Sequence, residues 1–463
     1  DVPADKHNTI SIAAGSYTDG EPAVKYRGIF LNDEWPCLGN WATDTFGGFN
    51  SKFYEKVFEL VLRLRGNFMW PAMWNSAFYD DDPMNGPLAN EMGIVMSTSH
   101  HEPMGMAQQD WKRRGTGEWN YATNGKVLRD FWQQGMERCK DWEAVITLAM
   151  RGDGDEAMSP DTNTKLLEKI VKDQRKIIEK VTGKKAKETP QVWALYKEVQ
   201  DYYDKGMRVP DDVTLLLCDD NWGNVRRLPA LDAKPRKGGY GMYYHVDYVG
   251  APRNSKWMNI TQIQRMWEQM NLTYLHGVRE IWVLNVGDLK PMEYPIQFFL
   301  DQAWDPTQYN PDNLLKHTQD FCATQFGEEY AEEAARLIDT YTKYNRRITP
   351  ELLNAQTYSL ENYNEWERVK NEYNALAFEA LKLYYLIPES HKDAFDQLVL
   401  FPIQACANLY EMYYAQAMNL TLAEKHDIEA NKWASQVEAC FTRDSILTHR
   451  FHHVMSNGKW NHI

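Results

Sequence analysis

Carboxylates, imidazoles and an arginine recur in this chain directly after short apolar runs. The densest example is segment 150–158, MRGDGDEAM, which follows the apolar run 144–149 and contains Arg151 and Asp155. Two carboxylic acids flanking a glycosidic bond can hydrolyse it, because one protonates the leaving oxygen and the other activates water. The segment therefore indicates hydrolytic acid–base chemistry as one candidate.

Similar polar groups end the other apolar runs. A single acid in such a place is ordinarily a solvated turn or a helix cap, and Asp153 and Glu156 fit that interpretation. Because polar residues follow most of the apolar runs, their recurrence instead favours one polar ligand that they bind together. The recurring residues are Asp33, Trp74, His100, Glu198, Asp219, Asn221, His245 and Tyr248.

The apolar runs themselves are expected to be β-strands. Helical patterns separate them, which predicts parallel βαβ units, and a closed (β/α)8 TIM barrel fits the span better than an open doubly wound sheet. The carboxyl ends of barrel strands meet at one rim, where active sites lie. The eight expected strands are 26–33, 67–72, 93–99, 144–150, 191–197, 213–218, 240–246 and 279–286.

The pattern changes to helix alone after Trp304-Asp305-Pro306. An apolar stripe at spacings of three and four runs from Trp366 to Leu383, and Pro402 is expected to kink the helical run that follows. The predicted organisation is a linker over 1–23, a catalytic barrel over 24–305 and an all-α helical bundle over 306–463.

Composition excludes several functions. A net charge of −14 argues against a nucleic-acid partner, and no apolar run is long enough for a membrane span. The six cysteines are scattered without CxxC spacing, so neither a zinc site nor a disulfide framework is expected. Seventeen Trp and 26 Tyr suit sugar stacking or a large aromatic core.

Two other classes of protein remain open from the residues. The first is a metal-dependent barrel hydrolase with His100, Asp155 and His245 as ligands. His100 and His101 are not expected to bind one metal, because neighbouring side chains on a strand point to opposite faces. The second is a carbohydrate-binding protein without catalysis, which would need the aromatic residues but not the surplus of carboxylates.

Several long motifs resemble the α-glucuronidases of glycoside hydrolase family 115 over about residues 24–463. The motifs are RGIFLNDEWP, NFMWPAMW, STSHHEPM, MRGDGDEAM, ALYKEVQDYYDKGMRVPDDVTLLLCDDNWGNVRRLP and YYHVDYVGAPRNSKWMN. The resemblance implies a (β/α)8 barrel followed by a helical bundle, and an inverting enzyme without a cofactor or metal. The implied substrate is the α-1,2-linked glucuronate or 4-O-methylglucuronate of glucuronoxylan or its aldouronic-acid oligosaccharides.

The resemblance also implies roles for single residues. Asp155 is the expected general acid and Glu198 the expected base, with Asp33 and Asp219 as competitors for the base. Arg151 is expected to hold the uronate carboxylate, because an acidic protein must supply local positive charge to an anionic substrate. The expected substrate contacts are Trp74, His100, Asn221, His245 and Tyr248.

The resemblance further suggests a secreted or periplasmic homodimer. Family members usually carry flanking domains on both sides of this region. The chain is therefore expected to be the middle part of a longer protein.

Overall fold

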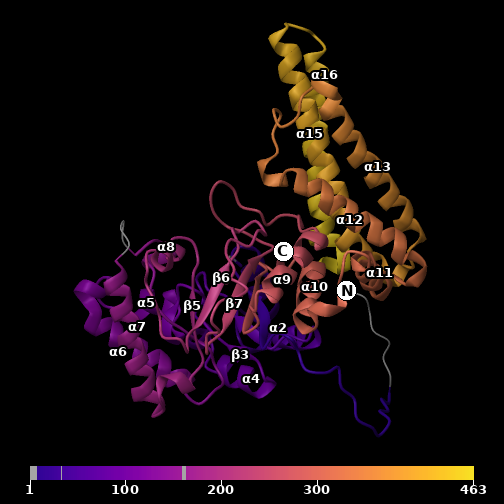
Figure 1. Cartoon of the computed structure of the whole chain (residues 1–463). Coiled ribbons are helices and arrows are strands. Elements are labelled where there is room, and N and C mark those ends of the chain that lie inside the picture. The colour runs from indigo at the N-terminus through magenta and orange to yellow at the C-terminus, as the bar shows by residue number, and fades with distance from the viewer. Residues whose placement is uncertain (1–7, 33, 159–162) are drawn as a thin grey trace. The chain divides into compact units, whose positions relative to one another are not determined.

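The computed structural model describes residues 8–32, 34–158 and 163–463, which form two compact units (Figure 1). The sheet unit comprises residues 21–248 and 265–309. The helical unit comprises residues 8–20, 249–264 and 310–463. None of the helices in the described ranges combines the length and apolar character needed to cross a membrane.

The sheet unit contains one parallel eight-stranded sheet in the order β3-β2-β1-β8-β7-β6-β5-β4. Its two outer strands meet at a single bridge between Met96 and Ala144, where the Val145 N–H donates to the Met96 carbonyl at 3.0 Å. The expected α/β class and all eight expected strands are confirmed, and the sheet is curled and barrel-like. The strands are β1 Tyr26–Phe30, β2 Phe68–Trp70, β3 Val95–Met96, β4 Ile146–Thr147, β5 Gln191–Ala194, β6 Thr214–Cys218, β7 Tyr240–His245 and β8 Ile281–Asn285.

The strands read as nearly continuous apolar runs because both faces of a parallel sheet are covered. Large side chains from several strands, among them Phe30, Trp70 and Tyr243, pack into one core cluster. Gly28 lies where β1 approaches β2 so closely that a Cβ atom would be 1.6 Å from the Phe68 carbonyl oxygen. Only glycine fits this register.

Helices connect successive strands, as a βαβ arrangement requires, except between β6 and β7, where residues 219–239 contain no helix. In α2 the side chain of Asn50 accepts the backbone N–H groups of Lys52 and Phe53, which caps the amphipathic helix. The helices of this part of the chain are α1 Cys37–Phe46, α2 Ser51–Arg63, α3 Phe78–Asp81, α4 Asn85–Met92, α5 Gln108–Arg114, α6 Tyr121–Cys139, α7 Thr164–Thr182, α8 Val199–Asp204, α9 Ile263–Leu275 and α10 Glu293–Trp304.

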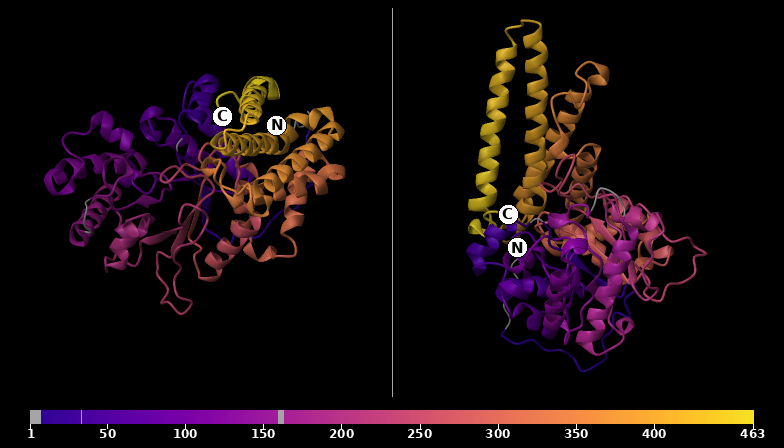
Figure 2. Two further views of the ribbon diagram at one scale, coloured as in Figure 1. Left: turned by 90° about the horizontal axis from the view of Figure 1, so that it is seen from above. Right: turned by 90° about the vertical axis from the view of Figure 1, so that its left-hand side faces the viewer.

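The helical unit contains the long helices α13, α15 and α16, and α15 packs against both of the others (Figures 1 and 2). The predicted stripe is confirmed, since its six apolar side chains from Trp366 to Leu383 are buried in α13. Pro402 lies in the first turn of α15, directly after a π-helical turn over Asp396–Leu400. The helices are α11 Leu314–Phe326, α12 Ala331–Arg347, α13 Glu365–Leu386, α14 Lys392–Phe395, α15 Phe401–Glu424 and α16 Ala430–His449.

Candidate active site

Arg151 joins the candidate acid to the candidate base. It follows β4, and its side chain is only 4% exposed. Its Nε and Nη2 donate to the two carboxylate oxygens of Glu198 at 2.9 and 2.7 Å, and its Nη1 contacts Oδ1 of Asp155. The fork of the guanidinium matches a carboxylate in this geometry, which is among the stronger polar contacts in proteins. The edge of the Arg151 guanidinium that was expected to hold a substrate carboxylate is therefore occupied by Glu198.

Two neighbouring histidines lie against the same aspartate. Nε2 of His100 is 2.9 Å, and Nδ1 of His101 is 3.6 Å, from Oδ1 of Asp155. The expectation that these rings point apart is wrong, because β3 ends at Met96 and both histidines lie in a turn, where the two-residue period of a strand does not apply.

Both imidazoles are buried and neutral in character. Burial is the main cause that holds the pKa of His100 and of His101 well below the usual value, and the positive charges of Arg151 and Lys197 act in the same direction. They therefore surround Asp155 without adding charge.

These residues also form the candidate cation site. Single ligand atoms of His100, His101 and Asp155 lie within 4.8 Å of one another, and neutral imidazole and carboxylate are suitable zinc ligands. However, the guanidinium of Arg151 contacts the same carboxylate, and its charge opposes a second cation there. The ligand set proposed from sequence differs, because Nδ1 of His245 lies against Asp219 instead.

Asp219 is a buried acceptor of four hydrogen bonds. Its Oδ1 accepts from Asn221 N–H at 3.1 Å and lies 2.6 Å from Nδ1 of His245. Its Oδ2 accepts from the N–H groups of Gly223 and His245, both at 3.1 Å. Because its side chain is 0% exposed and both oxygens are engaged, Asp219 is better placed to orient His245 than to activate water.

Trp74 covers the site beside the histidines. Its ring stacks on His101 with centroids 5.8 Å apart, and its Nε1 donates to Asn32 Oδ1 at 3.2 Å. Glu34 fixes the loop, since its Oε1 accepts from the backbone N–H groups of Met73 and Trp74. Burial raises the pKa of Glu34 well above its usual range. Asp33, the neighbouring candidate base, lies outside the described residues.

Four buried polar atoms at the site have no hydrogen-bond partner in the described part of the chain. These atoms are Oδ1 of Asn221, Nδ1 of His100, Nε2 of His101 and Nε2 of His245. Buried polar groups are normally paired, so this cluster indicates a site for a polar ligand.

Aromatic rings lie between these groups. The Tyr243 ring is 5.7 Å from that of His100 and 4.3 Å from that of His245. Tyr248 packs edge-on against Trp222, with ring centroids 5.3 Å apart. Apolar faces beside unpaired polar atoms are what a sugar ring requires.

The backbone is strained at this rim. Residues other than glycine adopt left-handed backbone angles after several strands, with φ of 58° at Asn75, 67° at Asp155, 48° at Lys197 and 70° at Asn221. Such angles persist only where the surrounding structure enforces them, and they concentrate at functional sites.

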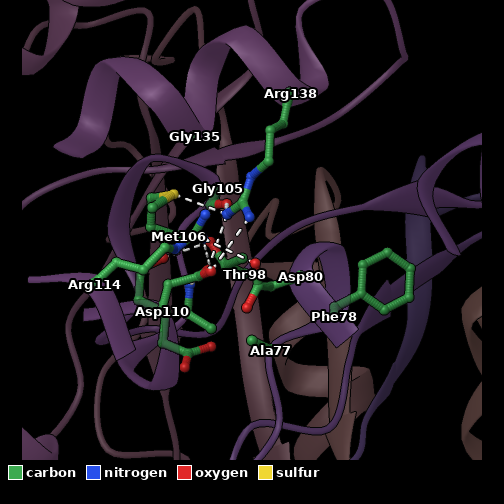
Figure 3. Close-up of polar contacts among 12 residues, drawn as sticks. Ala77, Phe78, Asp80, Thr98, Gly105, Met106, Asp110, Arg114, Gly135 and Arg138 are labelled. Atoms are coloured by element: carbon green, nitrogen blue, oxygen red, sulfur yellow. Dashed lines mark hydrogen bonds and ion pairs between the residues drawn. The ribbon is translucent and has the colours of Figure 1, made fainter. Parts of the chain in front are cut away.

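Side chains of α5 and α6 hold the loop that carries the histidines, and Figure 3 shows the contacts of Arg138 with Gly105 and Asp110. Asp110 accepts from the Ala107 N–H at the start of α5 and from Nη2 of Arg138 at 2.9 Å, and it also contacts Arg114. Burial acts to raise the pKa of Asp110, but these partners outweigh it and lower the value. Thr98 Oγ1 donates to the Glu102 carbonyl, which closes the turn around the histidines.

The structure brings the described sequence candidates to one rim of the sheet unit. Sequence reasoning did not select Glu34, His101 or Lys197, although each adjoins a residue that it did select. The only available signal was that adjacency, because burial and the turn geometry are not visible in the sequence.

Comparison with known proteins agrees with these features. The pattern of glycosyl hydrolase family 115 matches residues 19–352. A solved structure described as a family GH115 4-O-methyl-α-glucuronidase, BtGH115A, with specificity for decorated arabinogalactans, is 31% identical, with a TM-score of 0.84. The match covers 95% of this chain but only 60% of that one.

Two further structures are much less similar. A mutant of the Thermobaculum terrenum O-GlcNAc hydrolase is 8% identical over 95% of this chain and 93% of its own, with a TM-score of 0.37. CpGH84D is 11% identical over 91% and 70%, with a TM-score of 0.43. No curated protein matches the chain.

Proposed function

Since the chain belongs to glycosyl hydrolase family 115, we propose that it provides the catalytic part of an enzyme that removes glucuronate or 4-O-methylglucuronate from polysaccharide. The observation that carries the proposal is the guanidinium of Arg151, which contacts both Asp155 and Glu198 beside imidazoles that each have one unpaired nitrogen. The curled sheet would act as a (β/α)8 barrel, and the helices after Tyr309 as a bundle.

In the proposed mechanism Asp155 protonates the leaving oxygen and Glu198 activates water, with inversion at the anomeric carbon. Arg151 holds both carboxylate oxygens of Glu198, and it also contacts Asp155. As the acid, Asp155 must keep its proton although Arg151 contacts it. Substrate binding would therefore have to weaken the contact between Arg151 and Asp155. Asp219 would orient His245 towards the sugar.

Leaving-group dependence tests the two roles. Asp155→Asn should lose turnover of an aldouronic oligosaccharide by about 10²–10⁴-fold but keep most activity on an aryl glucuronide, whose leaving group needs no proton. Glu198→Gln should lose activity on both substrates. The opposite pattern would exchange the roles, and unchanged turnover in either variant would remove that residue from catalysis. Proton NMR of the first-released anomer tests inversion.

The polysaccharide is tested separately. Glucuronoxylan follows from the sequence resemblance, whereas the related structure is described as specific for decorated arabinogalactans. Release of (4-O-methyl)glucuronate should be measured from both polymers and from their oligosaccharides. Release from neither would refute the proposed activity, and binding without release would instead favour a carbohydrate-binding protein.

The histidine cluster supports metal-dependent hydrolysis as the second candidate. His100, His101 and Asp155 supply three ligand atoms for that chemistry. Loss of activity on chelation, with recovery on adding zinc, would favour it. Full activity after chelation would leave the two-carboxylate mechanism as the explanation.

A further inference from the structure

A cavity lies at the end of the sheet unit that is opposite the rim. It measures about 250 Å³ and is lined by the loop 229–236 between β6 and β7, by the start of β7 and by residues 275–277. Tyr240 begins β7 at this cavity, whereas His245 ends the same strand at the rim. At about 3.3 Å per residue the two positions are about 16 Å apart. A ligand in the cavity therefore lies outside the candidate active site.

The cavity is basic although the chain as a whole carries a net charge of −14. Lys234, Arg236 and His276 line it, and none of the described residues that line it is acidic. Glu280 lies next to the cavity, but its carboxylate pairs with Lys25 at 3.0 Å. A hollow lined by one sign of charge concentrates ligands of the opposite sign. The cavity therefore favours an anion.

Donor groups for an anion are available at the cavity. Nη2 of Arg236 donates to two backbone carbonyl oxygens at 2.9 and 3.0 Å, which fixes the side chain, whereas Nη1 has no acceptor among the described residues. Lys234 is exposed and pairs with no carboxylate in the described ranges. His276 donates through Nδ1 to the Pro229 carbonyl at 2.6 Å, since a carbonyl only accepts, and this leaves Nε2 for a ligand.

The rest of the wall is apolar and suits the C–H groups of a sugar ring. Leu231 and Leu275 line the cavity although they are 78% and 57% exposed. Exposed apolar side chains that gather beside polar groups are typical of binding sites. Tyr240 adds the surface of a half-buried aromatic ring. The cavity is smaller than the roughly 300–1,000 Å³ of sites for drug-sized ligands, so its size suits one sugar residue.

We propose that this cavity is a second, non-catalytic site that binds a carboxylate-bearing sugar. The carboxylate would lie between Lys234 and Arg236, and the sugar ring would contact Leu231 and Tyr240. The inference rests on the proposed function, because the polysaccharide of that function supplies the ligand, either as a glucuronate side chain or as the released product.

Histidine NMR reports this cavity separately from the rim. The chain has 12 histidines, and in a ¹³C-histidine-labelled sample the Cε1–H signal of His276 is identified by its absence from the variant His276→Gln. Glucuronate and glucose are titrated at constant pH. We expect glucuronate to shift the His276 signal saturably and glucose to leave it unchanged. No saturable shift, or an equal shift with glucose, would overturn the inference.

Lys234→Ala tests the charge and should leave the fold intact, because Lys234 is exposed. It should raise the Kd for glucuronate, measured at His276, about 10-fold or more, as for loss of a charged hydrogen bond. Lys237→Ala is the matched control, since Lys237 is exposed in the same loop but does not line the cavity. It should keep the wild-type Kd. An unchanged Kd in Lys234→Ala, or an equal rise in both variants, would overturn the inference.

Two further ligands identify the source of the sugar. A shift of the His276 signal by an aldouronic oligosaccharide would assign the cavity to side chains of the polymer, whereas a shift by free glucuronate alone would assign it to the released product. An equal response to inorganic phosphate would show a general anion site and overturn the inference. The measurement needs no turnover, so failure to release glucuronate would refute the proposed function and leave this result standing.

Discussion

Replacement of Asp219 by Asn probes how the rim is held together. Each oxygen of the buried Asp219 carboxylate accepts two hydrogen bonds, one pair from Asn221 and His245 and the other from Gly223 and His245. An Asn side chain has one accepting oxygen, and its NH2 group must face one of these pairs. If the NH2 group faces the backbone N–H groups of Gly223 and His245, two hydrogen bonds are lost and donors face donors. If it faces Asn221 and His245 instead, the Asn221 bond is lost, and His245 keeps a bond only when its Nδ1 becomes an acceptor.

The expected loss follows from this geometry. Hydrogen bonds to a charged group contribute about 1.5–3 kcal/mol each and neutral ones about 1 kcal/mol. The loss of one or two bonds, together with the loss of the charged acceptor for the others, amounts to about 3–6 kcal/mol of folding free energy. The imidazole of His245 also loses the partner that fixes its orientation, and turnover should fall by about 10²-fold or more. Urea-induced unfolding followed by tryptophan fluorescence, with kcat on an aldouronic substrate, measures both effects.

Asp220→Asn is the matched control. Oδ1 of Asp220 accepts from the backbone N–H groups of Trp222 and Asn224, and Oδ2 accepts only from the Asn224 side chain. Its replacement can keep the Oδ1 pair and should cost about 1 kcal/mol. The reasoning fails if Asp219→Asn is as stable as Asp220→Asn, to within about 1 kcal/mol.

Further predictions concern pH, sheet register and the bracing of the loop. Burial raises the pKa of Glu102 to about 8 from 4.5, so the folded chain keeps a proton that the unfolded chain releases. Stability should therefore fall as the pH rises from 4.5 to 8, and Glu102→Gln should flatten this part of a urea-midpoint profile; an equal slope would contradict the assignment. Gly28→Ala should abolish soluble expression, because its Cβ would lie 1.6 Å from a β2 carbonyl oxygen, whereas Gly125→Ala in α6 should fold with an equal or higher Tm. Asp110→Asn should cost about 3 kcal/mol in thermal unfolding, because the Arg138 charge loses its buried partner; a cost below about 1 kcal/mol would show the bracing to be unimportant.

Much of the fold is determined locally. Eight apolar runs separated by helical patterns predict eight parallel strands, since a strand covered on both faces must be apolar throughout. The stripe in α13 is equally local, because spacings of three and four residues put one face of a helix into the core. The rim residues follow from this pattern, as each lies at or shortly after the end of an apolar run.

Only the tertiary structure decides how these residues act on one another. No spacing shows that Arg151 contacts both Asp155 and Glu198, because β4 and β5 bring them together across a helix. No periodicity predicts that His100 and His101 face one carboxylate, since a turn aims them there. The sequence by itself determines which groups reach the rim, because hydrophobic patterning sets the strands. Their pairing depends on loop conformations and long-range contacts, and these exist only once the sheet has curled.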